Sequence, residues 1–306
     1  MHSPLFELLG TSAPSYFALL ITGFLFAAIV GVLWAKRIGQ NPDVIVDLTL
    51  SMLLAGVVGA RIMHVLADGY FWDYVHLCTD PSLVDWQLSE RACLSERYNG
   101  VWDAARQVCH PRKSNCFAWA YFWAGGLTYY GGFIAASITA WFLCKRDKFP
   151  FWKVADVAGF AVPLGLTFGR IGCLLAGCCF GIQNSGPLGV VFPGWSPASE
   201  SQYKAGLLRS MGSESLPVLP AQIAEAAATL AIAAFCMLVV HPRKRYDGHV
   251  FVVFVVLYAV ARFGLEFLRA DDRGGMLALS TSQWVGIALI AAAILIHVSR
   301  VKKLVN

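Results

Sequence analysis

The stretch YFALLITGFLFAAIVGVLW, residues 16–34, has no charged side chain and is long enough to cross a bilayer, for which about 20 apolar residues suffice. No basic residue precedes it, as one would in a signal peptide, so we expect a permanent span. Six further apolar runs follow it at 44–67, 117–144, 154–180, 221–240, 249–268 and 282–298. The sequence therefore predicts an all-α polytopic membrane protein with seven transmembrane helices in a single membrane-embedded domain, residues 1–306.

Basic residues alternate between the connecting segments in a way that predicts orientation. The loops after the first, third and fifth runs and the C-terminal tail carry Lys36, Arg37, Lys145, Arg146, Lys148, Lys153, Arg243, Lys244, Arg245, Arg300, Lys302 and Lys303. The positive-inside rule makes this side cytoplasmic, so the N-terminus lies outside and the C-terminus in the cytoplasm. The net charge of +5 follows from this topology and requires no nucleic-acid partner.

The two long loops on the outer side, 68–116 and 181–220, are rich in Trp, Pro, Gly and Ser and are expected to form a lid on the membrane surface. The first loop carries Cys78, Cys93, Cys109 and Cys116. An even number of cysteines in an oxidising compartment predicts two disulfides, with three connectivities open. Their spacings do not fit the paired C-x2-C pattern of zinc sites.

Three arginines lie inside the apolar runs, on the spans that run from inside to outside. At 1.5 Å per residue, Arg61 lies about 26 Å above the start of its span, Arg170 about 24 Å and Arg262 about 20 Å. Each could reach the interface or pair with a carboxylate, but their matching depth, where outer-leaflet phosphates lie, favours a shared site. A guanidinium offers paired hydrogen bonds to phosphate, so we expect them to hold an anionic headgroup.

Further polar residues accompany these arginines. Tyr258, Arg262, Glu266 and Arg269 fall at i, i+4, i+8 and i+11 on one helix face, where Glu266 can orient Arg262. The run at 221–240 opens with PAQIAEA, residues 220–226, which places Gln222 and Glu225 on one face near the outer surface.

Two acidic residues, Asp47 and Asp156, lie near the cytoplasmic ends of their spans, and we expect both to be structural. The stretch WAGGLTYYGGF, residues 123–133, has two Gly-Gly pairs on either side of Tyr129 and Tyr130. These glycines predict either close helix packing or a broken backbone that lines a cavity.

In chain order, W-x-G-G-x-x-x-x-G-G (123–132), G-R-x-G (169–172), P-x-Q-x-x-E (220–225) and R-x-x-x-E-F-x-R (262–269) resemble motifs of the bacterial prolipoprotein diacylglyceryl transferase family. The resemblance covers almost the whole chain. It implies transfer of the diacylglyceryl group from phosphatidylglycerol to the lipobox cysteine of a preprolipoprotein, with release of glycerol phosphate. This first step of lipoprotein maturation takes place at the bacterial inner membrane and needs no cofactor.

The resemblance also implies roles for individual residues. Arg170, Arg262 and Tyr258 match essential positions of the family and are expected to be catalytic. The other polar positions that match family motifs, expected to bind substrate together with the two arginines, are Arg61, Gln222, Glu225, Glu266 and Tyr16.

The chain departs from the family pattern at several positions. Tyr130 stands where the family has a histidine that is a candidate base, Ala224 replaces a tyrosine, and Cys173, Ala176 and Cys178 replace two asparagines and a glutamate. A thiol with pKa about 8.5 needs only modest help to ionise, so Tyr130 is a candidate proton relay. Alternatively, it is an aromatic packing residue.

Other functions remain open on the sequence alone. The missing histidine fits a non-catalytic or altered-specificity lipid-binding paralogue. Cys173, Cys178 and Cys179 at the outer end of one span suggest a membrane thiol oxidoreductase, although the usual C-x-x-C motif is absent. A transporter or flippase of anionic lipids could use the arginines, but no inverted repeat is visible.

Overall fold

The computed structural model of the chain describes residues 4–8, 11–86, 88, 90–94, 98–122, 126–270, 275–276 and 279–305. Within them, six helices are long and apolar enough to cross a membrane. They are α1 (Ser15–Arg37), α2 (Pro42–Ala67), α6 (Phe151–Ala176), α8 (Ala221–Phe235) continued by η4 (Cys236–Val240) and η5 (His241–Arg243), α9 (His249–Leu265) continued by η6 (Glu266–Leu268), and α10 (Thr281–Val305). The chain is an all-α, multi-pass membrane protein.

Large apolar side chains on these helices point away from the protein. Leu33, Leu54 and Leu295 are 59%, 68% and 70% exposed, whereas Gln222, Glu225 and Thr229 on α8 are almost fully buried. This inversion of the soluble pattern is expected where lipid is the solvent, because lipid accommodates apolar surface but cannot satisfy polar groups.

Within the described residues, the run at 117–144 forms an α-helix only in its second part. α5 extends over Tyr129–Arg146, and before it lies the one-turn helix η2, Ala118–Ala120. Gly126 has a left-handed φ of +70°, which ends any helical path. Arg61 binds the carbonyls of Ala118, Trp119 and Gly126, which a continuous helix would use for its own hydrogen bonds. α5 is not among the six helices above, and a seventh span stays a prediction.

The glycine-rich stretch shows close helix packing at one of its ends, where Gly131 at the start of α5 packs tightly on α2. Residues 126–128 before α5 are not helical, but a cavity lined by this backbone stays a prediction. A Cβ on Gly131 would lie 2.3 Å from the carbonyl oxygen of Gly59, so only glycine fits this contact.

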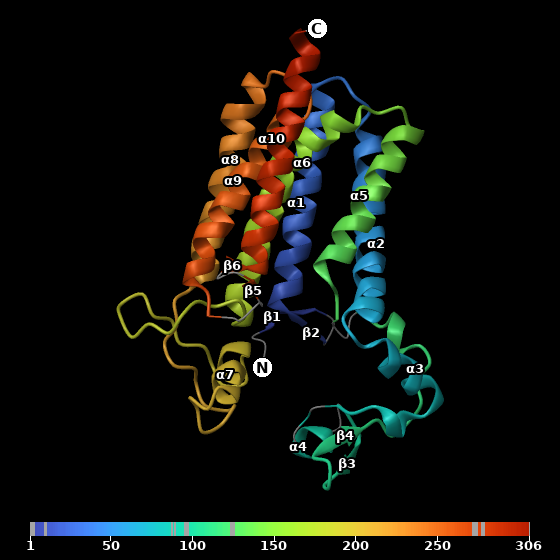
Figure 1. Cartoon of the computed structure of the whole chain (residues 1–306), viewed down its shortest axis with the longest axis vertical. Helices are drawn as coiled ribbons and strands as arrows, with labels where there is room; N and C mark the ends of the chain where they lie inside the picture. Colours follow the sequence, from blue (N-terminus) through green and yellow to red (C-terminus); the bar gives the residue numbers. More distant parts are fainter. Residues whose placement is uncertain are drawn as a thin grey trace. The chain divides into compact units, whose positions relative to one another are not determined.

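The chain divides into two compact units, residues 1–45 with 150–306 and residues 46–149, which are described separately. In the first unit α6 packs against α1, α8 and α9, and α10 packs against α9 (Figure 1). Thr167 on α6 and Thr229 on α8 share a buried hydrogen bond of 3.0 Å. This unit also holds α7 (Pro197–Lys204) and two hairpins, β1 (Pro4–Leu8) with β2 (Thr11–Pro14) and β5 (Gly275–Met276) with β6 (Leu279–Ser280).

A buried carboxylate fixes the beginning of α9. Asp156 on α6 accepts hydrogen bonds from the backbone N–H groups of Gly248 (3.0 Å) and Val250 (2.9 Å), and its other oxygen lies 2.9 Å from Nζ of Lys244. Asp156 is fully buried, whereas Asp47 is exposed. Asp156 therefore satisfies helix-terminal donors that would otherwise be unpaired.

The second unit contains α2 from Val46 onward, α5 and the segment between them. That segment forms α3 (Phe71–Thr79), η1 (Pro81–Leu83), α4 (Glu90–Cys93) and the antiparallel strands β3 (Val101–Asp103) and β4 (Val108–His110). Two disulfides cross-link it, Cys78–Cys116 and, nested inside, Cys93–Cys109. The lid proposed for the loops 68–116 and 181–220 stays a prediction.

Candidate active site

A buried carboxylate on α8 joins two of the arginines of the first unit. Oε1 of Glu225 lies 3.0 Å from Nη2 of Arg170 on α6, and its Oε2 lies 3.5 Å from Nη1 of Arg269, which follows η6. The Glu225 side chain is only 4% exposed. Because α6 and α8 pack along their length, Glu225 is held opposite Arg170 and fixes the direction of its guanidinium.

The third arginine of this unit has a carboxylate of its own. Nη2 of Arg262 lies 2.7 Å from Oε2 of Glu266, whose Oε1 accepts a hydrogen bond of 2.8 Å from Ser282 on α10. Tyr258, one turn before Arg262 on α9, interacts with Arg170, Glu225 and Arg262. Among the described residues, the buried Nη1 of Arg262 has no hydrogen-bond partner. A buried unpaired donor is costly, so it indicates a position for an acceptor atom of a ligand.

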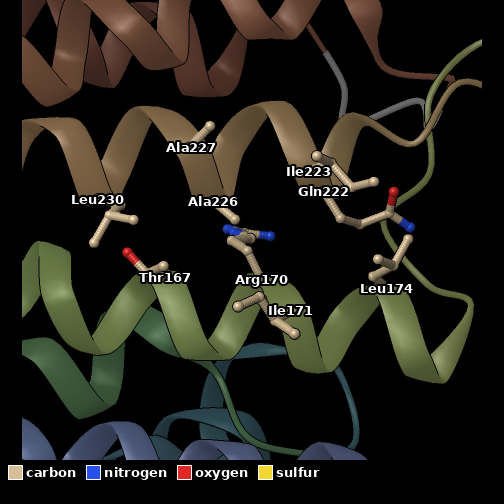
Figure 2. Close-up of a pocket in the computed structure, with 9 residues that line it drawn as sticks. All are labelled: Thr167, Arg170, Ile171, Leu174, Gln222, Ile223, Ala226, Ala227 and Leu230. Atoms are coloured by element: carbon tan, nitrogen blue, oxygen red, sulfur yellow. The ribbon is translucent and has the colours of Figure 1, made fainter.

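A cavity of about 230 Å³ lies between α6 and α8 with Arg170 in its wall. The rest of its lining is almost entirely apolar: Thr167, Ile171, Leu174, Gln222, Ile223, Ala226, Ala227 and Leu230. Figure 2 shows Arg170 extending from α6 toward α8 between Ala226 and Ile171. Ile171, Ile223 and Leu230 are among the exposed apolar side chains, so the cavity lies at the surface that faces lipid.

Two further expected residues border this site. Nε2 of Gln222 donates to the carbonyl of Cys178 (2.7 Å), and its buried Oε1 has no hydrogen-bond partner within the described part of the chain. Tyr16 on α1 packs against Gly172 on α6: a Cβ added to this glycine would lie 3.1 Å from Cδ2 of Tyr16. Tyr16 also interacts with Arg170. The structure thus brings Tyr16, Gln222 and Glu225 to the Arg170 side of the bundle.

Three cysteine sulfurs lie within 4.8 Å of one another beside these residues: Cys173 on the last turn of α6, and Cys178 and Cys179 after it. Hydrogen bonds from Cys173, Cys178 and Arg269 lower the pKa of the Cys179 thiol, and the charge of Arg170 adds to this effect. Hydrogen bonds with Cys173 and Cys179, together with burial, raise the pKa of the Cys178 thiol.

Arg61 and Tyr130 belong to the second compact unit, residues 46–149, whereas the site residues described above belong to the first unit. The guanidinium of Arg61 is buried and donates to the carbonyls of Trp119 (2.6 Å), Ala118 (2.8 Å) and Gly126 (3.1 Å) and to the Tyr74 hydroxyl (2.9 Å). These hydrogen bonds hold the segment before α5 in place. Tyr130 is 49% exposed at the beginning of α5, and its hydroxyl makes no hydrogen bond to a described residue.

Sequence reasoning missed three features of these sites. It did not assign a role in the site to Arg269 or to Ser282, which bind Glu225 and Glu266. It also missed His64, whose Nδ1 lies 2.9 Å from Oδ2 of Asp68. Hydrogen bonds from Thr128 and His64 lower the pKa of Asp68. The spacing Arg61, His64, Asp68 at i, i+3 and i+7 on one helix face was the available signal.

Comparison with known proteins identifies a family. The family model described as "Prolipoprotein diacylglyceryl transferase" matches residues 4–87 and 100–299, which covers most of the chain. The unmatched residues 88–99 lie in the loop with the disulfides and include Cys93.

Three relatives share this family's name. The phosphatidylglycerol–prolipoprotein diacylglyceryl transferase of Clostridium tetani is 28% identical over 99% of this chain and 100% of its own length. A second enzyme of this name from Clostridium perfringens is 26% identical over 97% of this chain and 94% of its own. One from Dehalococcoides mccartyi is 33% identical over 58% of this chain and 63% of its own.

Proposed function

The chain belongs to the prolipoprotein diacylglyceryl transferase family, and we propose that it transfers the diacylglyceryl group of phosphatidylglycerol to the lipobox cysteine of a preprolipoprotein. It is a transferase, and the bond formed is a thioether. The reaction releases glycerol phosphate and, by this proposal, takes place at the outer side of the bacterial inner membrane.

The observation that carries the proposal is the apolar cavity with Arg170 in its wall. A donor phospholipid has one anionic phosphodiester and long apolar chains, and the cavity offers a guanidinium beside an apolar lining. Its volume of about 230 Å³ suits part of a lipid, with the remaining methylenes on the exposed apolar faces of α6 and α8. Because the cavity faces lipid, the donor can enter sideways from the bilayer.

The arginines can stabilise the charge that develops when the bond to phosphate breaks. As the acceptor sulfur attacks the glyceryl carbon, the C–O bond to phosphate breaks and negative charge grows on the leaving phosphate. By this proposal that charge is stabilised by Arg170, which Glu225 orients, and by Arg262, whose Nη1 has no hydrogen-bond partner among the described residues. Tyr258 interacts with both arginines and, by this proposal, donates a hydrogen bond to the same group.

Arg61 takes a different part in this proposal. It binds the carbonyls of Ala118, Trp119 and Gly126, so by this proposal it supports binding by holding that backbone. The phosphate clamp itself rests on Arg170 and Arg262.

A reconstituted reaction tests the proposal. The purified chain in phosphatidylglycerol nanodiscs is incubated with a peptide that carries a lipobox cysteine, and mass spectrometry follows the thioether product and glycerol phosphate. We expect both products in equal amounts, and neither with a peptide in which serine replaces the cysteine. Saturable binding of the lipid without product would instead show a lipid-binding paralogue.

A further inference from the structure

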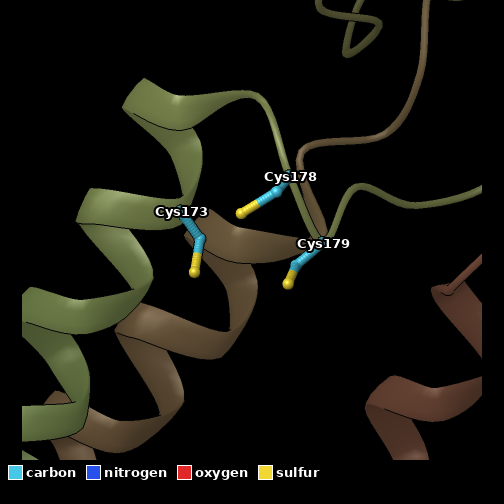
Figure 3. A group of neighbouring side chains, drawn as sticks. All are labelled: Cys173, Cys178 and Cys179. Carbon is cyan, nitrogen blue, oxygen red and sulfur yellow. The ribbon is translucent and has the colours of Figure 1, made fainter. Parts of the chain in front are cut away.

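Three thiols converge where α6 ends. The sulfurs of Cys173, Cys178 and Cys179 all lie within 4.8 Å of one another, and Figure 3 shows them directed into one common space. Cys173 is buried, and the other two are half-buried. The remaining free cysteines, Cys144 and Cys236, are not part of this cluster.

The backbone after α6 takes an unusual path to bring these sulfurs together. Gly177 has a φ of +70° and Cys179 a φ of +61°, so the chain turns back on the helix end. The N–H of Cys178 donates to the carbonyl of Cys173 at 3.1 Å. A left-handed conformation is unfavourable for cysteine, and such strain is concentrated at functional sites.

The spacing of the sulfurs fits a tetrahedral metal ion. Zinc–sulfur bonds of about 2.3 Å place the sulfurs of a tetrahedral site about 3.8 Å apart. From separations of at most 4.8 Å, the three sulfurs need to close by about 1 Å or less. A disulfide would use only two of them and leave the third thiol without a function.

The charges around the cluster favour the same conclusion. Arg170, Arg262 and Arg269 face the carboxylates of Glu225 and Glu266, which leaves one positive charge in this group. Three thiolates around a divalent ion carry one negative charge, so the two balance. Arg269 also interacts with Cys179, so a positive charge lies next to the cluster.

We propose that Cys173, Cys178 and Cys179 form a tris-thiolate site for a thiophilic divalent ion, zinc, whose fourth coordination position is open to an external thiol. Three protein ligands with an open fourth position are the pattern of catalytic zinc. The family resemblance implies no cofactor, so this site would be an addition in this chain.

The role of the site rests on the proposed function. The acceptor cysteine would bind the ion as its fourth ligand, and its proton would pass to solvent, because metal coordination deprotonates a thiol. The sulfur then attacks the glyceryl carbon; a C–S bond forms, and the C–O bond breaks. Glycerol phosphate leaves with the electron pair, and the ion is unchanged.

Metal content of the purified full-length chain tests the binding site without lipid or peptide. We expect one zinc per chain after dialysis against zinc, and sulfur-to-metal charge-transfer absorption when cadmium replaces it. The triple variant Cys173→Ser, Cys178→Ser, Cys179→Ser should lose both signals. The control Cys144→Ser, Cys236→Ser removes two buried thiols outside the cluster and should keep both.

Single variants keep the test decisive if the triple variant misfolds. Each of Cys173→Ser, Cys178→Ser and Cys179→Ser should weaken zinc binding by roughly tenfold or more. The site would be overturned if the unaltered chain held no more zinc than the triple variant. A disulfide between any two of the three cysteines in chain purified without oxygen would overturn it as well.

Activity then separates the two proposals. If the chain binds one zinc ion but transfers the lipid equally fast after the zinc has been removed, the activating role is overturned and the transferase function stands. Zinc binding in a chain that forms no thioether under any condition would overturn the proposed function, while the metal site stands.

Discussion

Glu225 Oε1 lies 3.0 Å from Nη2 of Arg170, and this pair joins α6 to α8 at the wall of the apolar cavity. The carboxylate is buried and also reaches Arg269, so the direction of the Arg170 guanidinium is fixed by the protein before any lipid binds. Such preorganisation is what a site needs to stabilise charge that develops only during a reaction.

The first prediction follows from this geometry. Arg170→Gln should lower kcat/KM for transfer by roughly 10²–10³-fold, because a fixed cation at the phosphate is lost. Arg170→Lys should fail almost as badly, since an ammonium cannot both pair with Glu225 and bind phosphate through two N–H groups. Steady-state rates in nanodiscs measure the effect.

Arg146→Gln is the matched control, because Arg146 has an exposed side chain that pairs with Asp147. It should keep the wild-type rate. A near-normal rate for Arg170→Lys would show that simple charge neutralisation, without paired contacts, suffices at this position.

The second prediction concerns the cavity between α6 and α8. Ala227 lines it and is exposed to lipid, so Ala227→Phe should fill it without disturbing the packed interior. We expect the KM for phosphatidylglycerol to rise about tenfold, which corresponds to about 1.4 kcal/mol of lost binding. The KM for the peptide should stay unchanged.

Ala234→Phe serves as the control, two turns further along α8, where the alanine is exposed and does not line the cavity. Equal KM values for lipid in the two variants would show that the donor does not occupy this cavity.

The third prediction tests a purely structural residue. Asp156→Ala should lower the free energy of unfolding by about 3–5 kcal/mol, because it leaves Lys244 without its buried partner and two N–H groups of α9 unpaired. Thermal unfolding in detergent measures it. Asp47→Ala, at an exposed position, should have little effect, and equal losses would contradict the assigned role of Asp156.

The apolar runs predicted most helices of the fold correctly. Six of them correspond to helices that can span a membrane, and α9 begins at the predicted residue, His249. Hydropathy could not show that, within the described residues, the α-helix of the run at 117–144 begins only at Tyr129, because the cause lies elsewhere. Arg61 binds carbonyls 57 to 65 residues away in sequence, a contact that no local pattern reveals.

The candidate site was predictable to a similar degree. Helical spacing paired Arg262 with Glu266, as the structure has them. Depth along the spans grouped Arg170 with Arg262, and both arginines interact with Tyr258; their shared role in a site stays a prediction. Depth alone also grouped Arg61 with these two arginines. The N–H groups of Arg61 donate to residues of its own unit. The partner of Arg170 on another helix, Glu225, could be listed from its motif but not paired, because the packing of α6 on α8 decides that contact.

The fourth prediction concerns the disulfides. In intact cells, a membrane-impermeant thiol reagent should label Cys78, Cys93, Cys109 and Cys116 only after reduction. Peptide mapping should then recover the nested pairs Cys78–Cys116 and Cys93–Cys109. The double variant Cys78→Ser, Cys116→Ser should keep the inner pair. Labelling without reduction would contradict the pairing, and no labelling after reduction would contradict the predicted outer location of this loop.

The last prediction addresses how the acceptor thiol loses its proton. If Tyr130 relays it, Tyr130→Phe should lower the rate by roughly 10²–10⁴-fold near pH 7. The loss should shrink as the pH rises past about 8.5, because the free thiol then ionises without help. The comparison variant is His64→Asn, since His64 is oriented by Asp68 and lies in the same unit as Tyr130.

The pattern of rates across pH assigns the step. A wild-type profile for Tyr130→Phe removes Tyr130 from the mechanism, and a pH-dependent loss in His64→Asn then makes His64 the base. Wild-type profiles in both variants, with loss of transfer in the Cys173, Cys178 and Cys179 variants, leave metal coordination as the source of the thiolate. Because zinc ionises its ligand outright, that mechanism predicts a rate that depends little on pH above 7.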